Sequence, residues 1–177
     1  MRLSPKTLFA IFLCAATLAL PTTTAAQKAR AKTNAPAKAQ APAAHTEITK
    51  EKIEAIISAL EAAAKKKEFS AITAYLAPDF KYKSGGGDRP LREANRAEYA
   101  EMLKLVTLVT LDYTYMRKSL TITIAPDGQS ATAHIEAFEM VTLEKGTLAG
   151  HTTSFDTFKI YKGKILISAM EASMIYV

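Results

Sequence analysis

Residues 130–143, SATAHIEAFEMVTL, alternate between two kinds of side chain, and this alternation decides the class of fold. One alternate set is mostly small and apolar, and the other is larger and more polar. Successive side chains of a strand point to opposite faces, so the pattern predicts a strand with one buried face. We expect the inward set to be Ala131, Ala133, Ile135, Ala137 and Val141.

Alternation of this kind continues on both sides of the segment. It predicts further strands at Tyr113–Ile124, at about Thr152–Tyr161 and at Ile165–Val177. Before the second strand, Pro126 fixes one backbone angle and Gly128 accepts a positive one, which is typical of a turn. The sequence YKGK predicts a tight hairpin before the last strand. Together these signals predict a four-stranded antiparallel meander.

The segment before the meander has helical spacing. Apolar residues three and four apart predict a helix from about Thr49 to Lys67 and a shorter one over residues 69–76, which Pro78 ends. A short strand is expected at Asp79–Lys83.

The sequence NRAE predicts the start of a third helix. Asn95 and Glu98, three residues apart, form an Asn-led capping box and predict a helix from Arg96 to Val106 or Val109. Helices at one end of an antiparallel sheet make an α+β fold, and a curved sheet around the first helix would leave a cavity.

The N-terminus has the pattern of a secretory signal peptide over residues 1–26. Arg2 and Lys6 precede the uncharged run Thr7–Leu20, which is shorter than the roughly 20 residues that span a bilayer. We predict cleavage near Ala26, with an uncleaved anchor as the alternative, and a periplasmic or secreted protein.

Residues 27–46 are rich in Ala, Lys and Pro and lack large apolar side chains, so we predict a disordered basic tether that could touch the cell envelope. The only cysteine, Cys14, lies in the signal segment, so the domain at 47–177 has no disulfide. From residue 47 on, 17 Lys and Arg balance 17 Asp and Glu, which argues against nucleic-acid binding.

Residues 84–88, SGGGD, raise the question of a phosphate-binding loop. Such a loop ends in Gly-Lys followed by Ser or Thr, whereas Asp88, Arg89 and Pro90 follow these glycines. We interpret the segment as a turn at the cavity mouth, with a loop that contacts ligand as the alternative.

The segments EFSAITAYLAPDF (68–80) and YKGKILISAMEAS (161–173) resemble a helix, a strand and the last hairpin of the nuclear transport factor 2-like superfamily, also called ketosteroid isomerase-like or SnoaL-like. The resemblance covers residues 49–177 and implies a cone-shaped, cystatin-like fold with a cavity. It does not settle the activity, because this superfamily contains enzymes and non-enzymes.

The resemblance also implies where isomerase groups would lie. In the isomerases, a tyrosine and an acid donate hydrogen bonds and a carboxylate acts as the base; these positions fall on Leu60, Phe155 and Ser84, so all three groups are missing. A shift of the hairpin register by one residue would place Asp156 at the acid position. We expect these three positions to contact a ligand, together with Tyr75, Tyr82, Tyr99 and Glu171.

Other carboxylates are candidate acid–base groups. Glu139 is in phase with the inward set of its strand, and Glu171 is in phase with Ile165 and Ile167. Two inward carboxylates near an apolar cavity would have raised pKa values, so Glu139, Glu171 and Asp156 are the catalytic candidates. The alternative is that a bulge turns the glutamates toward water.

The remaining polar pattern points to the outer face of the sheet. His134 and Glu136 fall opposite the inward set, and without a third ligand we expect no metal site and no cofactor. Tyr113, Tyr115 and Arg117 share one face and suggest an interface. In the superfamily that the chain resembles, the outer face of the sheet commonly forms dimers, so the resemblance implies a homodimer through this face.

Two functions remain open from the sequence. One is an exported module that binds a small apolar or amphipathic molecule or another protein. The other is an acid–base enzyme, of isomerase, cyclase or hydrolase type, that uses displaced carboxylates on a small carbonyl substrate.

Overall fold

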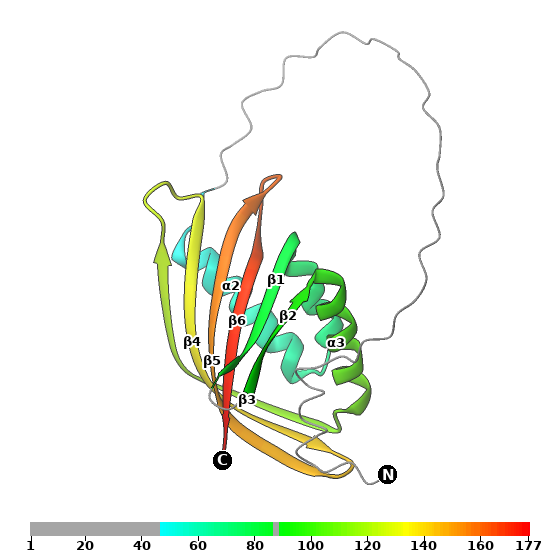
Figure 1. The fold of residues 1–177 in the computed structure, drawn as a ribbon. Helices are drawn as coiled ribbons and strands as arrows, with labels where there is room; N and C mark the ends of the chain where they lie inside the picture. Colours follow the sequence, from blue (N-terminus) through cyan, green and yellow to red (C-terminus); the bar gives the residue numbers. More distant parts are fainter. Residues whose placement is uncertain (1–46, 87–88) are drawn as a thin grey trace, which may run out of the picture.

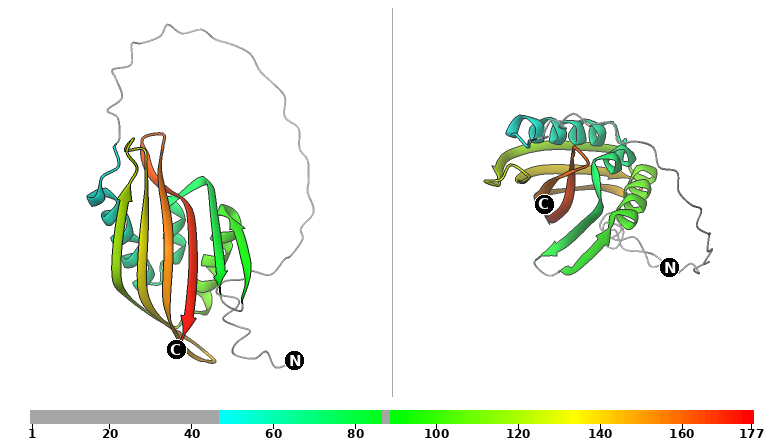
Figure 2. Two further views of the ribbon diagram at one scale, coloured as in Figure 1. Left: turned by 60° about the vertical axis from the view of Figure 1, so that its left-hand side comes forward. Right: turned by 90° about the horizontal axis from the view of Figure 1, so that it is seen from above.

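The structure is a computed structural model that describes residues 47–177 apart from 87–88. The predicted signal peptide and tether lie outside the described residues. The described residues contain three helical segments. They lie on one side of a curved sheet, as Figures 1 and 2 show. The predicted α+β class is confirmed. Among the helices of the described part, none has both the length and the apolar character needed to cross a membrane.

The helices begin where the sequence supplies caps. Helix α2 spans Lys50–Lys65, and the Thr49 side chain accepts a hydrogen bond from the Lys52 N–H. The second helix is a 3₁₀ helix, η1, over Phe69–Tyr75. Helix α3 spans Arg96–Val109.

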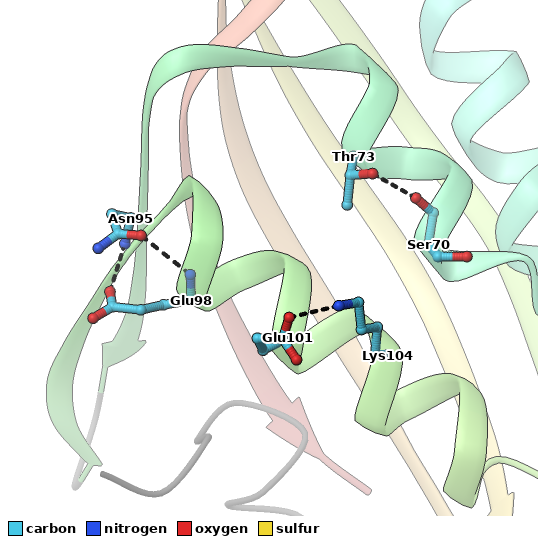
Figure 3. Close-up of polar contacts among 6 residues, drawn as sticks. All are labelled: Ser70, Thr73, Asn95, Glu98, Glu101 and Lys104. Atoms are coloured by element: carbon cyan, nitrogen blue, oxygen red, sulfur yellow. Dashed lines mark hydrogen bonds and ion pairs between the residues drawn. The ribbon is translucent and has the colours of Figure 1, made fainter. Parts of the chain in front are cut away.

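The predicted capping box opens helix α3 (Figure 3). The Asn95 side chain accepts from the Glu98 N–H, and the Glu98 carboxylate accepts from the Asn95 N–H at 2.8 Å. One turn later, Lys104 Nζ lies 2.6 Å from Glu101 Oε1. These local interactions fix the start of the helix that carries Tyr99 toward the sheet.

The sheet contains six strands in the order β2-β1-β6-β5-β4-β3. All neighbours are antiparallel except β1 and β6, which are parallel. The predicted four-stranded meander is confirmed. The strands are β1 (Leu76–Gly86), β2 (Arg89–Asn95), β3 (Asp112–Ile124), β4 (Ser130–Leu143), β5 (Gly146–Tyr161) and β6 (Lys164–Tyr176).

Two details of the strands differ from prediction. Strand β5 begins at Gly146 rather than near Thr152, because a two-residue turn suffices to leave β4. Strand β2 is unexpected, since its polar, proline-containing sequence has low strand propensity. It forms an edge hairpin with β1, in which Lys83 pairs with Glu93. Gly85 and Gly86 belong to β1, and the rest of the turn predicted at 84–88, residues 87–88, lies outside the described residues.

The core lies between α2 and the concave face of the sheet. The inward set predicted for β4 is buried, as expected. Phe80 and Phe158 from the sheet and Ile53 from α2 are almost completely buried in the same cluster.

Candidate functional site

A cavity of about 230 Å³ lies between the helices and the concave face of the sheet. Its lining is mostly apolar and comes from the three helical segments and the sheet. The apolar lining includes Ile57, Leu60, Met102, Leu103, Ile135 and Met170. The predicted ligand contact at Leu60 is thus a cavity position. Such a lining suits a small molecule with an apolar body.

Strand β5 contributes a polar stripe to this cavity. Thr152, Ser154 and Asp156 all line it, because alternate residues of a strand share a face. Phe155 points the other way: it is 53% exposed and stacks on His134 with ring centroids 4.5 Å apart. The expectation that Phe155 contacts a ligand is therefore wrong, and Asp156 occupies the inward position one residue on.

Asp156 is an incompletely satisfied carboxyl group. It is only 3% exposed, and its Oδ1 has no hydrogen-bond partner among the described residues. Burial raises the pKa of Asp156 to about 7, against the opposing effect of a hydrogen bond with Ser154. Near neutral pH the group therefore exists in both protonation states, as a proton donor or acceptor requires.

Glu139 also lines the cavity, in the inward phase that the sequence predicts for β4. The Tyr113 hydroxyl donates a hydrogen bond of 2.7 Å to Glu139 Oε2. Burial raises the pKa of Glu139, and the Tyr113 hydrogen bond opposes this shift. Thr152 opposes it as well, although the Thr152 hydroxyl makes no hydrogen bond of good geometry.

Four tyrosines also line the cavity, Tyr82, Tyr99, Tyr113 and Tyr115, and Glu61 and Ser173 add further polar groups. Tyr82 and Tyr99 are both expected ligand contacts, and their ring centroids lie 4.7 Å apart. Burial raises the pKa of Tyr82 to about 12 and that of Tyr99 well above its usual range. These hydroxyls remain neutral donors at physiological pH. Within the described residues, the Tyr99 hydroxyl donates to Met170 Sδ at 3.6 Å, which is a weak acceptor.

The face of β3 that carries Tyr113, Tyr115 and Arg117 is an inner face, so its assignment to an interface is wrong. Tyr115 pairs with Glu139, and residues directly opposite on paired strands share a face. Arg117 reaches α2, where its Nε lies 3.3 Å from Glu61 Oε1. The pairing of β3 with β4 shows that these side chains face inward, but the sequence of β3 alone does not reveal which strand it pairs with.

Glu171 lies outside the cavity and is exposed, so its inward placement is wrong. Ile167 pairs with Phe158 and Ala169 pairs with Thr157, which leaves Ser168 as an extra residue in β6. This bulge reverses the inward phase beyond it. Of the other expected ligand contacts, Ser84 is buried in β1 and Tyr75 packs beside the core, and neither is part of the cavity lining.

In residues 47–177, outside the gap at 87–88, no group of three or more His, Cys, Asp or Glu side chains is placed to hold a metal ion.

Neither a family model nor a curated protein matches the chain in sequence. Solved structures do match in fold. One, assigned as an aromatic ring hydroxylase of Novosphingobium aromaticivorans, has a TM-score of 0.62 and 11% identity, over 72% of this chain and 92% of that one. Another from the same species, assigned as a scytalone dehydratase, has a TM-score of 0.60 and 12% identity, over 71% and 83%.

A third similar structure is an NTF2-like protein of unknown function from Pseudomonas putida. It has a TM-score of 0.57 and 16% identity, over 70% of this chain and 84% of that one. At these identities the likeness concerns the fold, and it confirms the fold that the sequence predicts.

Proposed function

We propose that this chain, which has the nuclear transport factor 2-like fold, binds a small molecule with an apolar body and a carbonyl or hydroxyl group, and that Asp156 transfers a proton on it. The observation that carries the proposal is the buried Asp156 carboxyl with an unpartnered oxygen in an apolar cavity. An unsatisfied buried polar group is destabilising, and a ligand that hydrogen-bonds to the free oxygen of Asp156 would remove this cost.

The surrounding tyrosines suit the same chemistry. As a base, Asp156 would take a proton from a hydroxyl group or from a carbon beside a carbonyl. The neutral hydroxyls of Tyr82 and Tyr99 would then donate hydrogen bonds to the oxygen that gains negative charge. Returning the proton at another atom would complete an isomerisation, and losing water would complete a dehydration. Two of the similar structures bear the names of a dehydratase and a hydroxylase.

A carrier that binds such a molecule without converting it is the second candidate. In the register of β4 and β5, Asp156 pairs with Ala133 and Glu139 pairs with Gly150. Six residues of strand separate the two carboxyl groups, which is roughly 20 Å along the backbone. They therefore do not form a two-carboxylate centre, and this separation favours either one acid–base group or none.

Proton exchange distinguishes the two candidates. β-Tetralone, a small ring ketone with acidic C–H groups, would be incubated with the protein in D₂O, and deuterium uptake followed by proton NMR. We expect the chain to accelerate uptake, and Asp156→Asn to lose this acceleration by about 10²–10⁴-fold. Glu171→Gln is the matched control and should retain it. Binding without accelerated exchange would favour the carrier, and an absence of binding would contradict both.

We further propose that the chain is exported, to the periplasm or out of the cell, and pairs as a homodimer through the outer face of the sheet. Exposed Met116, Phe155 and Ile175 support a contact on this face. The basic residues 27–46 would add weak contact with the envelope. Native mass spectrometry of the exported chain would report the cleavage site, the oligomer and any retained ligand; an uncleaved monomer would contradict this proposal.

A further inference from the structure

The C-terminal half of helix α3 presents large apolar side chains to solvent. Leu105, Leu108 and Val109 are three and four residues apart, so they share one face of the helix, and Leu111 lies two residues beyond its end. The exposed fraction is 80% for Leu108, 55% for Leu111 and 40% for the other two. We call these four residues the α3 patch. Single exposed apolar residues are ordinary, but a contiguous group of them marks an interaction site.

The other side of α3 is used inside the molecule. Met102, Leu103 and Val106 are buried and line the cavity. The helix packs against η1, β1 and β2, and it lies at the margin of the molecule, as Figure 1 shows. Helix α3 is therefore apolar on two sides, and the packing of the described residues uses one of them.

A run of three lysines adjoins the α3 patch. Lys65 ends helix α2, Lys66 is its C-cap, and Lys67 Nζ donates a hydrogen bond of 2.8 Å to the Leu111 carbonyl oxygen. Lys67 has a φ of 60°, a conformation that usually belongs to glycine, and a glycine would lack the side chain that reaches Leu111. Lys65 and Lys66 are exposed, and neither has a carboxylate within 4.0 Å among the described residues.

The carboxylates near the patch do not cancel this charge. Glu101, one turn before Leu105, is paired with Lys104 at 2.6 Å (Figure 3). Glu68 follows the lysine run and Asp112 follows the patch, so two further carboxylates stand against three lysines. The surface is thus mainly apolar, with a small positive excess along one edge.

We propose that the α3 patch and the lysines at 65–67 dock on a bilayer that contains anionic phospholipid. The aliphatic side chains would enter the interface, and the lysine ammonium groups would extend to the headgroups while their stems lie along apolar surface. Area argues against a second protein as the occupant. Four partly exposed aliphatic side chains offer a few hundred Å², whereas each partner in a stable protein interface contributes about 800 Å².

Docking at this place would bring one wall of the cavity close to lipid. Leu103 and Val106 line the cavity on one side of α3, and the patch lies on its exposed side. An apolar molecule would then pass between the bilayer and the protein with little exposure to water. The inference does not depend on proton transfer by Asp156.

Co-sedimentation with large unilamellar vesicles tests the proposal, with POPC alone compared with POPC that contains about 30% POPG. Every variant keeps residues 1–46, so their contribution is common to all. We expect the wild type to bind the POPG vesicles about tenfold more tightly than POPC. Leu108→Ser should weaken binding to both by about tenfold. Lys65→Gln with Lys66→Gln should weaken binding about tenfold on POPG vesicles and leave binding to POPC unchanged.

Two matched controls lie elsewhere on the surface. Leu91 is 70% exposed and lies two residues before Glu93 in β2, and Glu93 contacts Lys83 on the outer face of the sheet. Leu91→Ser should therefore leave vesicle binding unchanged. Lys162→Gln with Lys164→Gln removes two charges from the β5–β6 hairpin, at the opposite end of the sheet from the patch (Figure 1). Charges further from the bilayer than a Debye length contribute little, so this variant should bind as the wild type does.

Several results would overturn the proposal. They are an absence of vesicle binding by the wild type, equal losses for Leu108→Ser and Leu91→Ser, and equal affinity for the two vesicle types. Sedimentation velocity detects the other occupant: an oligomer that Leu108→Ser dissociates would assign the patch to a second copy of the chain. Deuterium exchange on β-tetralone needs no vesicles, so the proposed function and this inference fail separately.

Discussion

The two ends of the cavity present the same chemical group in two different states. Glu139 is half-buried and Asp156 is buried. Both are carboxyl groups on the concave face of the sheet, and desolvation raises the pKa of each. Glu139 is held by the Tyr113 hydroxyl, whereas an oxygen of Asp156 has no partner. Burial alone therefore does not identify the reactive group, and the carboxyl group with unfilled hydrogen-bonding capacity is the better candidate.

The largest expected effect is on the pH dependence of stability. Asp156 has a folded-state pKa of about 7 against an ordinary value of 3.8, so the folded chain binds this proton more tightly. Stability is therefore fully present below about pH 4 and falls as the pH rises toward 7. Asp156→Asn removes this loss and should stabilise the chain by about 2–4 kcal/mol at pH 8, with no gain at pH 4.

Urea unfolding followed by circular dichroism at both pH values would measure that difference. An equal effect of Asp156→Asn at pH 4 and pH 8 would show that the carboxyl group titrates normally. The contrast between the two cavity ends would then disappear.

A second prediction concerns the backbone beside Glu139. A Cβ atom added at Gly150 would lie 2.7 Å from the Ile175 carbonyl oxygen, so strand β6 would have to move. Gly150→Ala should destabilise the chain by about 1–3 kcal/mol. Thr153→Ala, on the outer face of the same strand, is the control. If the two ends are independent, the pH dependence due to Asp156 should survive Gly150→Ala.

A third prediction compares two neighbouring tyrosines on β3. Tyr113→Phe removes the donor to Glu139 and should cost about 1–2 kcal/mol. Tyr115→Phe is the matched control, because no hydrogen bond from its hydroxyl is seen within the described residues, and it should change stability by less than about 0.5 kcal/mol. Thermal unfolding of the two variants would measure the loss of stability in each. Equal losses would show that the Tyr113–Glu139 hydrogen bond makes no net contribution to stability.

The smallest effect is expected at the carboxylate that the sheet turns outward. Glu171 is exposed beyond the β6 bulge, so Glu171→Gln should change stability by less than about 0.5 kcal/mol and leave ligand binding unchanged. A loss of binding in calorimetry comparable to that of Asp156→Asn would contradict the inward phase of β6 described above.

The sequence predicts those parts of the site that depend on unbroken periodicity. Strand β4 pairs without interruption along β5, so the inward direction of Glu139 follows from alternation alone. In β6 the extra residue Ser168 reverses the phase, and no local signal in ILISAME reveals it. A register error of one residue likewise exchanged Phe155 for Asp156.

The orientation of β3 needed long-range information. Tyr113 and Tyr115 share a face by alternation, but which face is buried depends on the strand that pairs with them. Strand β2 was missed for another reason: it is an edge strand, stabilised by pairing with β1 rather than by its own propensity. The fold class, the helices and the meander depend on local signals, and these predictions are confirmed, as is the inward phase of β4.

The parallel pairing of β1 with β6 has a consequence for how the chain is made. Tyr82 pairs with Met170, so the strand that follows the first helices lies beside the last strand in the sheet. On the ribosome, β1 cannot reach its place until β6 has emerged, and until then Phe80 and Tyr82 lack part of the surface that buries them. Folding through such distant contacts is slow, and the cavity closes only once β6 has paired with β1.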